Sequence, residues 1–207
     1  MGMISKTGIL WILILTTGLV RSAVAQEEHG KVENQEGREK ETFTRVTLGS
    51  TSGKPDSSVM IPIYVTPAQN VEVGRLKLEV SYVSANLKFA KLDPGIGAQL
   101  SDLHLDTAVK DGKNDKGVGT QTVVISVSLP SSETPKKGIP AGLLAYLMLR
   151  ISENGRPASI TVRASAEADA LGTNKPLANI KTENATLDVV APSAEPLPSI
   201  NCFFFTH

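Results

Sequence analysis

The chain has few of the residues from which disulfide frameworks and active sites are built. Its 207 residues include one cysteine, Cys202, so no intrachain disulfide can form. It has three histidines and one tryptophan, and aromatic residues make up 4% of the total. Basic and acidic residues both number 21, so no basic surface for nucleic acid is expected. These shortages argue against a disulfide-stapled domain, a histidine-based catalyst and a nucleic-acid-binding protein.

The apolar run near the start of the chain is too short to span a bilayer comfortably. Residues 8–20 form 13 apolar or neutral positions, whereas a membrane-spanning helix needs ~20. Lys6 precedes the run and Ala23-Val24-Ala25 follows it, which is the pattern of a secretory signal cleaved before Gln26. Residues 1–25 are therefore predicted to be a signal peptide, and an uncleaved membrane anchor is the alternative. Export without a disulfide framework favours a bacterial secreted or cell-surface protein.

The remaining chain divides into three parts by composition. Residues 26–42 are polar apart from Val32, which predicts a disordered linker. Residues 43–191 alternate apolar and polar side chains, which predicts one β-sandwich domain. Residues 192–207 are predicted to be a flexible, proline-rich tail with a phenylalanine-rich end. Cys202, in that tail, is either an inert thiol or a site of intermolecular linkage.

Alternation with a period of two predicts about nine strands between residues 43 and 191. The clearest case is residues 75–82, where Leu76, Leu78, Val80 and Tyr82 alternate with charged or hydroxyl side chains. A strand series of this density predicts an all-β fold. We expect a two-sheet sandwich with jelly-roll topology, related to the folds of carbohydrate-binding modules.

Three segments have a composition that leaves more than one local structure open. Residues 141–150 contain good helix formers, but the flanking prolines and glycines favour a strand over a helix. Residues 164–171 are rich in alanine and are expected to form an irregular crossover with at most a helical turn. Pro62 lies inside an alternating segment. That strand should therefore lie at a sheet edge, or Pro62 should occupy a position without a ladder hydrogen bond.

Five motifs follow one another in a fixed order across the domain. They are a strand ending in glycine, a strand containing proline, a Tyr corner with a following x-x-Leu-x-Phe and Pro-Gly turn, an Ile-Pro-x-Gly-x-Leu opening and a closing strand. The five motifs are Val46–Gly49, Val59–Ile63, Tyr82–Gly95, Ile139–Leu144 and Asn184–Val189. Together they resemble the cohesin domain of bacterial cellulosome scaffoldins and their non-cellulosomal relatives. The corner departs from that family, because Val83-Ser84 stands where the family carries Asp-Pro.

The resemblance implies a nine-stranded jelly roll with a flat strand face that binds a dockerin module on another protein. It also implies an extracellular, often polysaccharide-degrading context. Charged side chains on such a face would orient the partner, and small hydroxyl side chains would let the two backbones approach. A solvated strand surface is the alternative for the same positions. The candidate partner-binding residues are Arg75, Lys77, Glu79, Ser81, Thr122, Val124, Ser126, Ser128 and Arg163.

No catalytic residue, metal ligand or cofactor is predicted, so the chain is not expected to be an enzyme. His104 is the one histidine outside the two ends of the chain, and no nucleophile turn surrounds any serine. Residues 111–117 look like a calcium loop, but Lys113 falls at position three of the loop and Thr122 at position twelve, where oxygen ligands are required. We therefore expect a flexible hairpin loop there.

These observations predict a secreted, non-catalytic module that recognises a dockerin-type protein. Two alternatives remain. One is direct polysaccharide binding, for which Tyr64 and Tyr146 would supply only a thin aromatic platform. The other is a structural role in an envelope assembly, anchored through the phenylalanine-rich end.

Overall fold

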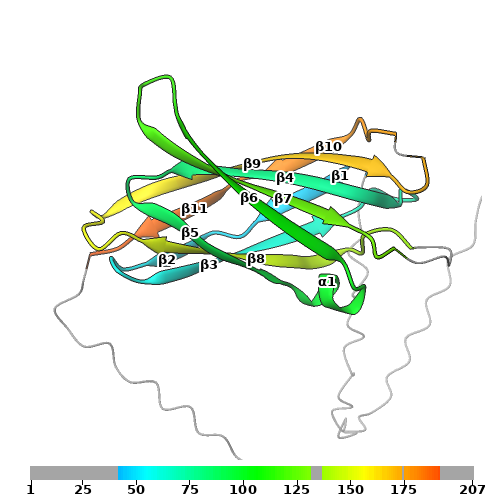
Figure 1. Ribbon diagram of the computed structural model, residues 1–207, viewed down its shortest axis with the longest axis horizontal. Helices are drawn as coiled ribbons and strands as arrows, with labels where there is room; N and C mark the ends of the chain where they lie inside the picture. Colours follow the sequence, from blue (N-terminus) through cyan, green and yellow to red (C-terminus); the bar gives the residue numbers. More distant parts are fainter. Residues whose placement is uncertain (1–41, 132–136, 174, 192–207) are drawn as a thin grey trace, which may run out of the picture. The chain divides into compact units, whose positions relative to one another are not determined.

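The computed structural model describes residues 42–131, 137–173 and 175–191, which form two β-sheets packed face to face and one short helix (Figure 1). The predicted signal, the predicted linker up to residue 41 and the predicted tail, with Cys202, lie outside the described residues. The five-stranded sheet has the order β10 (Ile180–Glu183), β1 (Thr44–Leu48), β3 (Ser58–Thr66), β8 (Gly142–Ile151) and β5 (Leu87–Pro94). The six-stranded sheet has the order β2 (Thr51–Gly53), β11 (Ala185–Val189), β9 (Ala158–Ala170), β4 (Val73–Val83), β7 (Gly119–Ser128) and β6 (His104–Lys113). Helix α1 (Ile96–Leu100) follows β5.

The core lies between the sheets and is built from the apolar half of each alternating strand. Leu76, Leu78 and Val80 on β4 are completely buried, as are Ile61 and Leu147 in the opposite sheet. Burying a side chain of this size contributes roughly 1.5–3 kcal/mol. The all-β, jelly-roll prediction is confirmed. The described residues form eleven strands, where about nine were expected. The two additional strands are β2 and β10, of three and four residues, which are too short for their alternation to be noticed in the sequence.

Pro62 lies in an internal strand, at a position where the missing N–H costs no hydrogen bond between paired strands. Strand β3 is flanked by β1 and β8, and the pairing with β1 ends at Leu48 and Ile63. The Pro62 carbonyl accepts a hydrogen bond of 2.8 Å from the amide of Gly49, just beyond that pairing. A Cβ at Gly49 would lie 2.5 Å from Cγ of Pro62, so glycine permits this close approach. The second of the two expectations for Pro62 is therefore the correct one.

The expectation of a crossover at residues 164–171 was wrong, because residues 164–170 form the second half of β9. Ala164, Ala166 and Ala168 turn inward and pair with Val80, Leu78 and Leu76 of β4. The intervening side chains point outward. Alanine favours helix by only ~0.5 kcal/mol or less per residue over most residues, and pairing with β4 overrides that preference. Residues 142–151 form strand β8, as the sequence predicts.

Strands β6 and β7 form a long hairpin whose far half projects beyond the sandwich (Figure 1). Their pairing runs without interruption from His104 opposite Ser128 to Lys113 opposite Gly119. In the connecting turn the Asn114 side-chain oxygen accepts hydrogen bonds of 3.0 Å from the amides of Lys116 and Val118. The hairpin expected at residues 111–117 is thus present, although β6 continues through Lys113 and shortens the loop.

Candidate partner-binding face

The outer face of the six-stranded sheet, meaning the surface turned away from the core, carries all nine candidate residues. The pairing of β4 with β7 and β9 arranges them in four adjacent rows. In each row a β4 residue stands between a β9 residue and a β7 residue. The rows are Asp169–Arg75–Ser128, Glu167–Lys77–Ser126, Ser165–Glu79–Val124 and Arg163–Ser81–Thr122.

Val124 differs from the other eight candidates. It lies outside the core cluster and points to the outer face, but only 8% of its surface is exposed. In the register it stands between Glu79 of β4 and Ala108 of β6. With so little of its surface exposed, Val124 offers a partner little contact area, which corrects the expectation for this residue.

The charges of the central rows are already paired within the domain. The Lys77 ammonium lies 3.1 Å from a carboxylate oxygen of Glu79 and 3.5 Å from one of Glu167. The hydrogen bond to Glu79, followed by the negative charge of Glu167, raises the pKa of Lys77. Arg75 lies 3.6 Å from Asp169. All five side chains contact solvent, so these pairs fix orientation more than they stabilise the fold.

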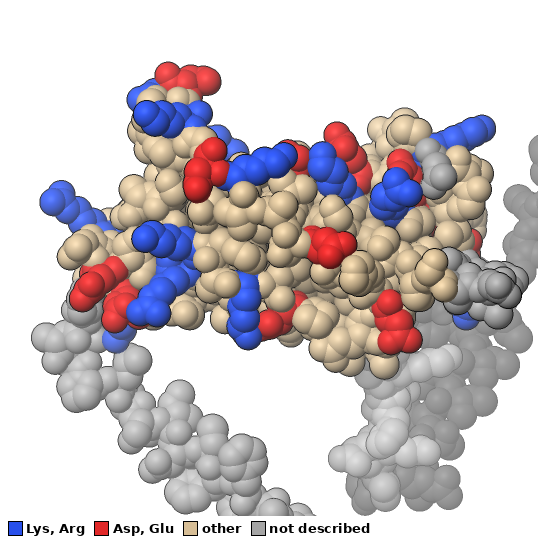
Figure 2. Space-filling view, in the orientation of Figure 1, with Lys and Arg blue, Asp and Glu red and all other residues tan. Residues whose placement is uncertain are grey.

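Arg163 is the exception among the charged candidates. No carboxylate of the described residues lies within 4.0 Å of its guanidinium, and its side chain is exposed. Figure 2 shows acidic and basic side chains interspersed over the surface in view, with neither sign collected in one patch. Arg163 shares this lack of a carboxylate neighbour with Lys110 of β6, which stands beside Thr122 in the same row.

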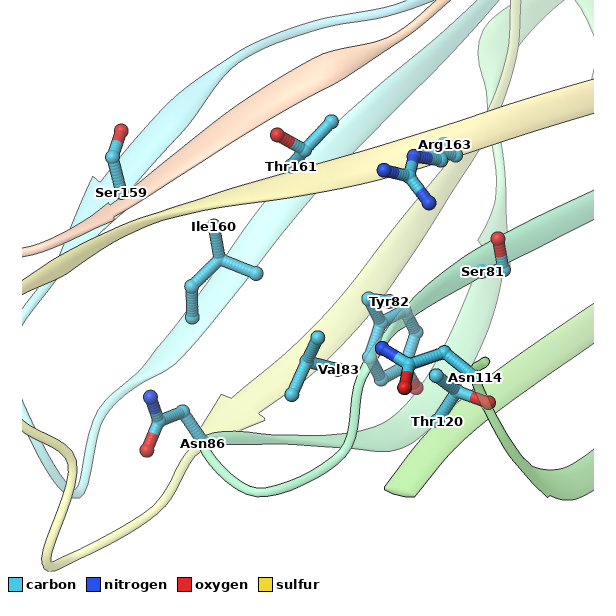
Figure 3. A pocket seen from close by; sticks show the side chains of 10 residues that line it. All are labelled: Ser81, Tyr82, Val83, Asn86, Asn114, Thr120, Ser159, Ile160, Thr161 and Arg163. Carbon is cyan, nitrogen blue, oxygen red and sulfur yellow. The ribbon is translucent and has the colours of Figure 1, made fainter. Parts of the chain in front are cut away.

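A hollow of about 330 Å³ opens beside Arg163, where two strands of the sheet part. Strands β4 and β9 stay paired as far as Ser81 and Arg163; beyond that point β4 continues beside β7 and β9 continues beside β11. Arg163 and Thr161 lie on one side of the hollow, and Asn114 and Thr120 of the hairpin lie on the other (Figure 3). The lining residues are Ser81, Tyr82, Val83, Asn86, Asn114, Thr120, Ser159, Ile160, Thr161 and Arg163.

The lining of this hollow combines polar and apolar groups. Its lining offers hydroxyl and amide groups, one guanidinium and an apolar part formed by Val83 and Ile160. None of the lining residues is a histidine, cysteine, aspartate or glutamate, so the hollow has no side chain suited to general acid–base work near neutral pH. Sequence reasoning did not find it, because the parting of two strands is not visible in their alternation.

A partly buried polar network holds the base of the hairpin against the sandwich. The Tyr82 hydroxyl donates to the side-chain oxygen of Gln121 at 2.7 Å, and the Phe89 amide donates to the same oxygen at 2.9 Å. The Gln121 side-chain nitrogen donates to Asp111 at 2.9 Å. Burial, with a smaller effect of the Asp111 charge, raises the pKa of Tyr82. The sequence offers a signal for Gln121, because it occupies an inward position of β7 two residues before Val123, where the alternation predicts an apolar side chain.

The residues considered from the sequence for catalysis or for polysaccharide binding lie apart from this face or at its margin. His104 is 3.4 Å from Asp106 on the edge strand, and both side chains are about 70% exposed. Tyr64 is 43% exposed and Tyr146 is half-buried, both on the five-stranded sheet. Within the described residues, no three histidine, cysteine or acidic side chains are grouped as a metal site would require. No helix there has the length and apolar character needed to cross a membrane.

No family model and no curated protein matches the chain. Solved cohesin structures do. The third ScaC cohesin of Acetivibrio cellulolyticus, solved with a ScaB dockerin, is 19% identical, with 72% of this chain and 100% of that chain covered and a TM-score of 0.55. The domain has the cohesin fold.

Two further structures agree with this assignment of the cohesin-like domain. The seventh ScaB type I cohesin of Pseudobacteroides cellulosolvens is 14% identical, covers 80% of this chain and 99% of its own, and has a TM-score of 0.53. The OlpC cohesin of Clostridium thermocellum, solved with a dockerin, is 12% identical, with 76% and 99% covered and a TM-score of 0.53. The resemblance found in the motifs is thus confirmed at the level of the fold.

Proposed function

We propose that the cohesin-like domain is a non-catalytic binding module that recognises a dockerin-type protein through its outer face. The observation that carries this proposal is the strand register, which gathers eight accessible candidate side chains into four adjacent rows. Solved domains of the same fold are found in complexes with dockerins. The face is a continuous strand surface, and the hollow beside Arg163 lies at its end.

The rows suggest how such a face would work. Hydroxyl side chains at Ser81, Ser126 and Ser128 are short, so a partner helix or loop could approach the strands closely while keeping hydrogen-bond partners. The ion pairs around Lys77 hold their charges in fixed positions before contact, which reduces the cost of ordering them on binding. Arg163 supplies an unpaired positive charge, which favours a carboxylate on the partner.

Titration calorimetry against a panel of dockerin modules tests the proposal. Ser126→Arg places a long side chain in the middle of the rows, and Lys77→Glu reverses the central charge. Each should weaken binding by at least about tenfold, or roughly 1.4 kcal/mol. Lys91→Glu is the matched control, because Lys91 pairs with Asp93 at 2.8 Å on the other sheet. Binding that both outer-face variants leave unchanged would exclude this face, and binding of no dockerin would exclude the partner class.

We further propose that the module is exported and acts in polysaccharide degradation. An amino terminus beginning at Gln26 in the secreted product would support cleavage of the signal, whereas an intact amino terminus in the membrane fraction would support an anchor.

Direct polysaccharide binding keeps one supporting feature, the exposed ring of Tyr64. Affinity electrophoresis on cellulose, xylan and chitin tests it, and Tyr64→Ala should abolish any retardation. The envelope role rests on residues 192–207 and is tested by deleting them and following fractionation.

A further inference from the structure

Strand β6 is an open edge of the six-stranded sheet. Within the described residues it pairs with β7 and with no other strand. Nine of its ten residues are exposed, and Val109 keeps 42% of its surface accessible. An open edge presents unpaired N–H and C=O groups that can join another strand. Figure 1 shows this edge running along the sheet and out into the projecting hairpin.

The sequence of this edge is complementary to itself. We propose that two copies of the chain pair antiparallel through β6 about a two-fold axis at Ala108. In that register Asp106 of each copy stands directly opposite Lys110 of the other, and Thr107 stands opposite Val109. Asp106 and Lys110 have β7 partners Ser126 and Thr122, which are both on the outer face. Their side chains therefore project from the same surface and can form two ion pairs.

The charges also select this register over its neighbours. An axis at Asp106 places that carboxylate opposite its own copy, and an axis at Lys110 does the same for the ammonium, so both registers oppose like charges. An axis at Thr107 or Val109 makes no Asp–Lys pair. Among the described residues, no carboxylate lies within 4.0 Å of the Lys110 ammonium, so Lys110 would give up no ion pair on pairing. Asp106 lies 3.4 Å from His104 on the same strand, and its carboxylate would share or exchange that contact for the one with Lys110.

The axis is perpendicular to the sheet, so both outer faces would point to the same side. The pair would then present two dockerin sites next to each other, a consequence that rests on the proposed function. The pairing itself does not depend on it. A contact along one strand buries less than the ~800 Å² per partner of a standard interface, so the dimer should be weak and concentration-dependent.

Sedimentation equilibrium of the full chain over a wide concentration range tests the pairing. Asp106→Lys and Lys110→Asp should each weaken self-association about tenfold or more, because each opposes like charges twice across the axis. The double variant should restore it, and an equimolar mixture of the two single variants should form a mixed dimer. Lys113→Asp makes the same charge change beyond the paired core and should have little effect. A monomer at every concentration, or a dimer indifferent to these exchanges, would overturn the proposal.

A cross-link locates the axis independently of charge. Directly opposed residues in antiparallel strands have Cα atoms ~4.5–5.5 Å apart, within the range that a disulfide spans. Ala108→Cys in a Cys202→Ser background should therefore yield a covalent dimer on mild oxidation. Val118→Cys, exposed in the turn of the same hairpin, should cross-link far more slowly. Equal rates for the two cysteines would contradict pairing through β6.

Discussion

Replacing Gln121 by leucine should destabilise the domain by about 2–4 kcal/mol. The Gln121 side-chain oxygen is the acceptor for two groups, the Tyr82 hydroxyl and the Phe89 amide. Each buried donor left without a partner costs about 1–3 kcal/mol, and partial hydration at this end of the sandwich reduces the sum. Tyr82→Phe should cost less, about 0.5–1.5 kcal/mol, because it removes its own donor and leaves the bond to Phe89 in place.

The double variant distinguishes a shared acceptor from two independent contacts. With both side chains replaced, the Tyr82 donor no longer needs an acceptor, so the combined cost should fall about 1 kcal/mol below the sum of the single costs. Urea unfolding of the four proteins, with the slopes compared to confirm similar exposure of surface, measures these free energies. Additive costs within error would show that Tyr82 and Gln121 are not coupled as the 2.7 Å contact requires.

Three further predictions test the face assignment, the titration of Tyr82 and the hairpin turn. Leu78→Ala should lower the free energy of unfolding by ~2–5 kcal/mol, since Leu78 is fully buried opposite Ile125 and Ala166. Lys77→Ala should lower it by no more than ~0.5 kcal/mol. Equal losses in urea unfolding would show that the two faces of β4 are wrongly assigned. The pKa of Tyr82 is raised in the folded state. The contribution of its hydroxyl to the free energy of unfolding is therefore complete below the ordinary tyrosine pKa of ~10 and is lost as pH rises above that value. Stability should fall more steeply from about pH 9 to 11 in the parent than in Tyr82→Phe. Asn114→Ala should cost about 1 kcal/mol and speed amide exchange at Lys116 and Val118, whose N–H groups it leaves without that acceptor, and unchanged exchange would argue against the turn geometry.

Alternation was sufficient to assign the two faces of β4 and β7, because a strand alternates its side chains whatever lies beside it. Leu76 and Leu78 are buried and Arg75 is exposed for that reason. Alternation failed at residues 164–170, where composition favoured another structure. The alternating residues there are alanines, whose low hydrophobicity hides a pattern that the pairing with β4 makes plain.

The parts of the candidate site that the sequence could not supply depend on distances between strands. Whether Arg163 finds a carboxylate is decided by its row: it pairs with Ser81, while the rows of Arg75 and Lys77 end in Asp169 and Glu167. A shift of two residues between β4 and β9 would place different side chains together without changing either face. The register therefore decides which charged side chains form ion pairs within the domain and which remain unpaired and open to a partner. It also opens the hollow, since β4 and β9 separate where their pairing ends at Ser81 and Arg163. Recognition by this domain thus depends on the alignment of its strands as much as on the residues they carry.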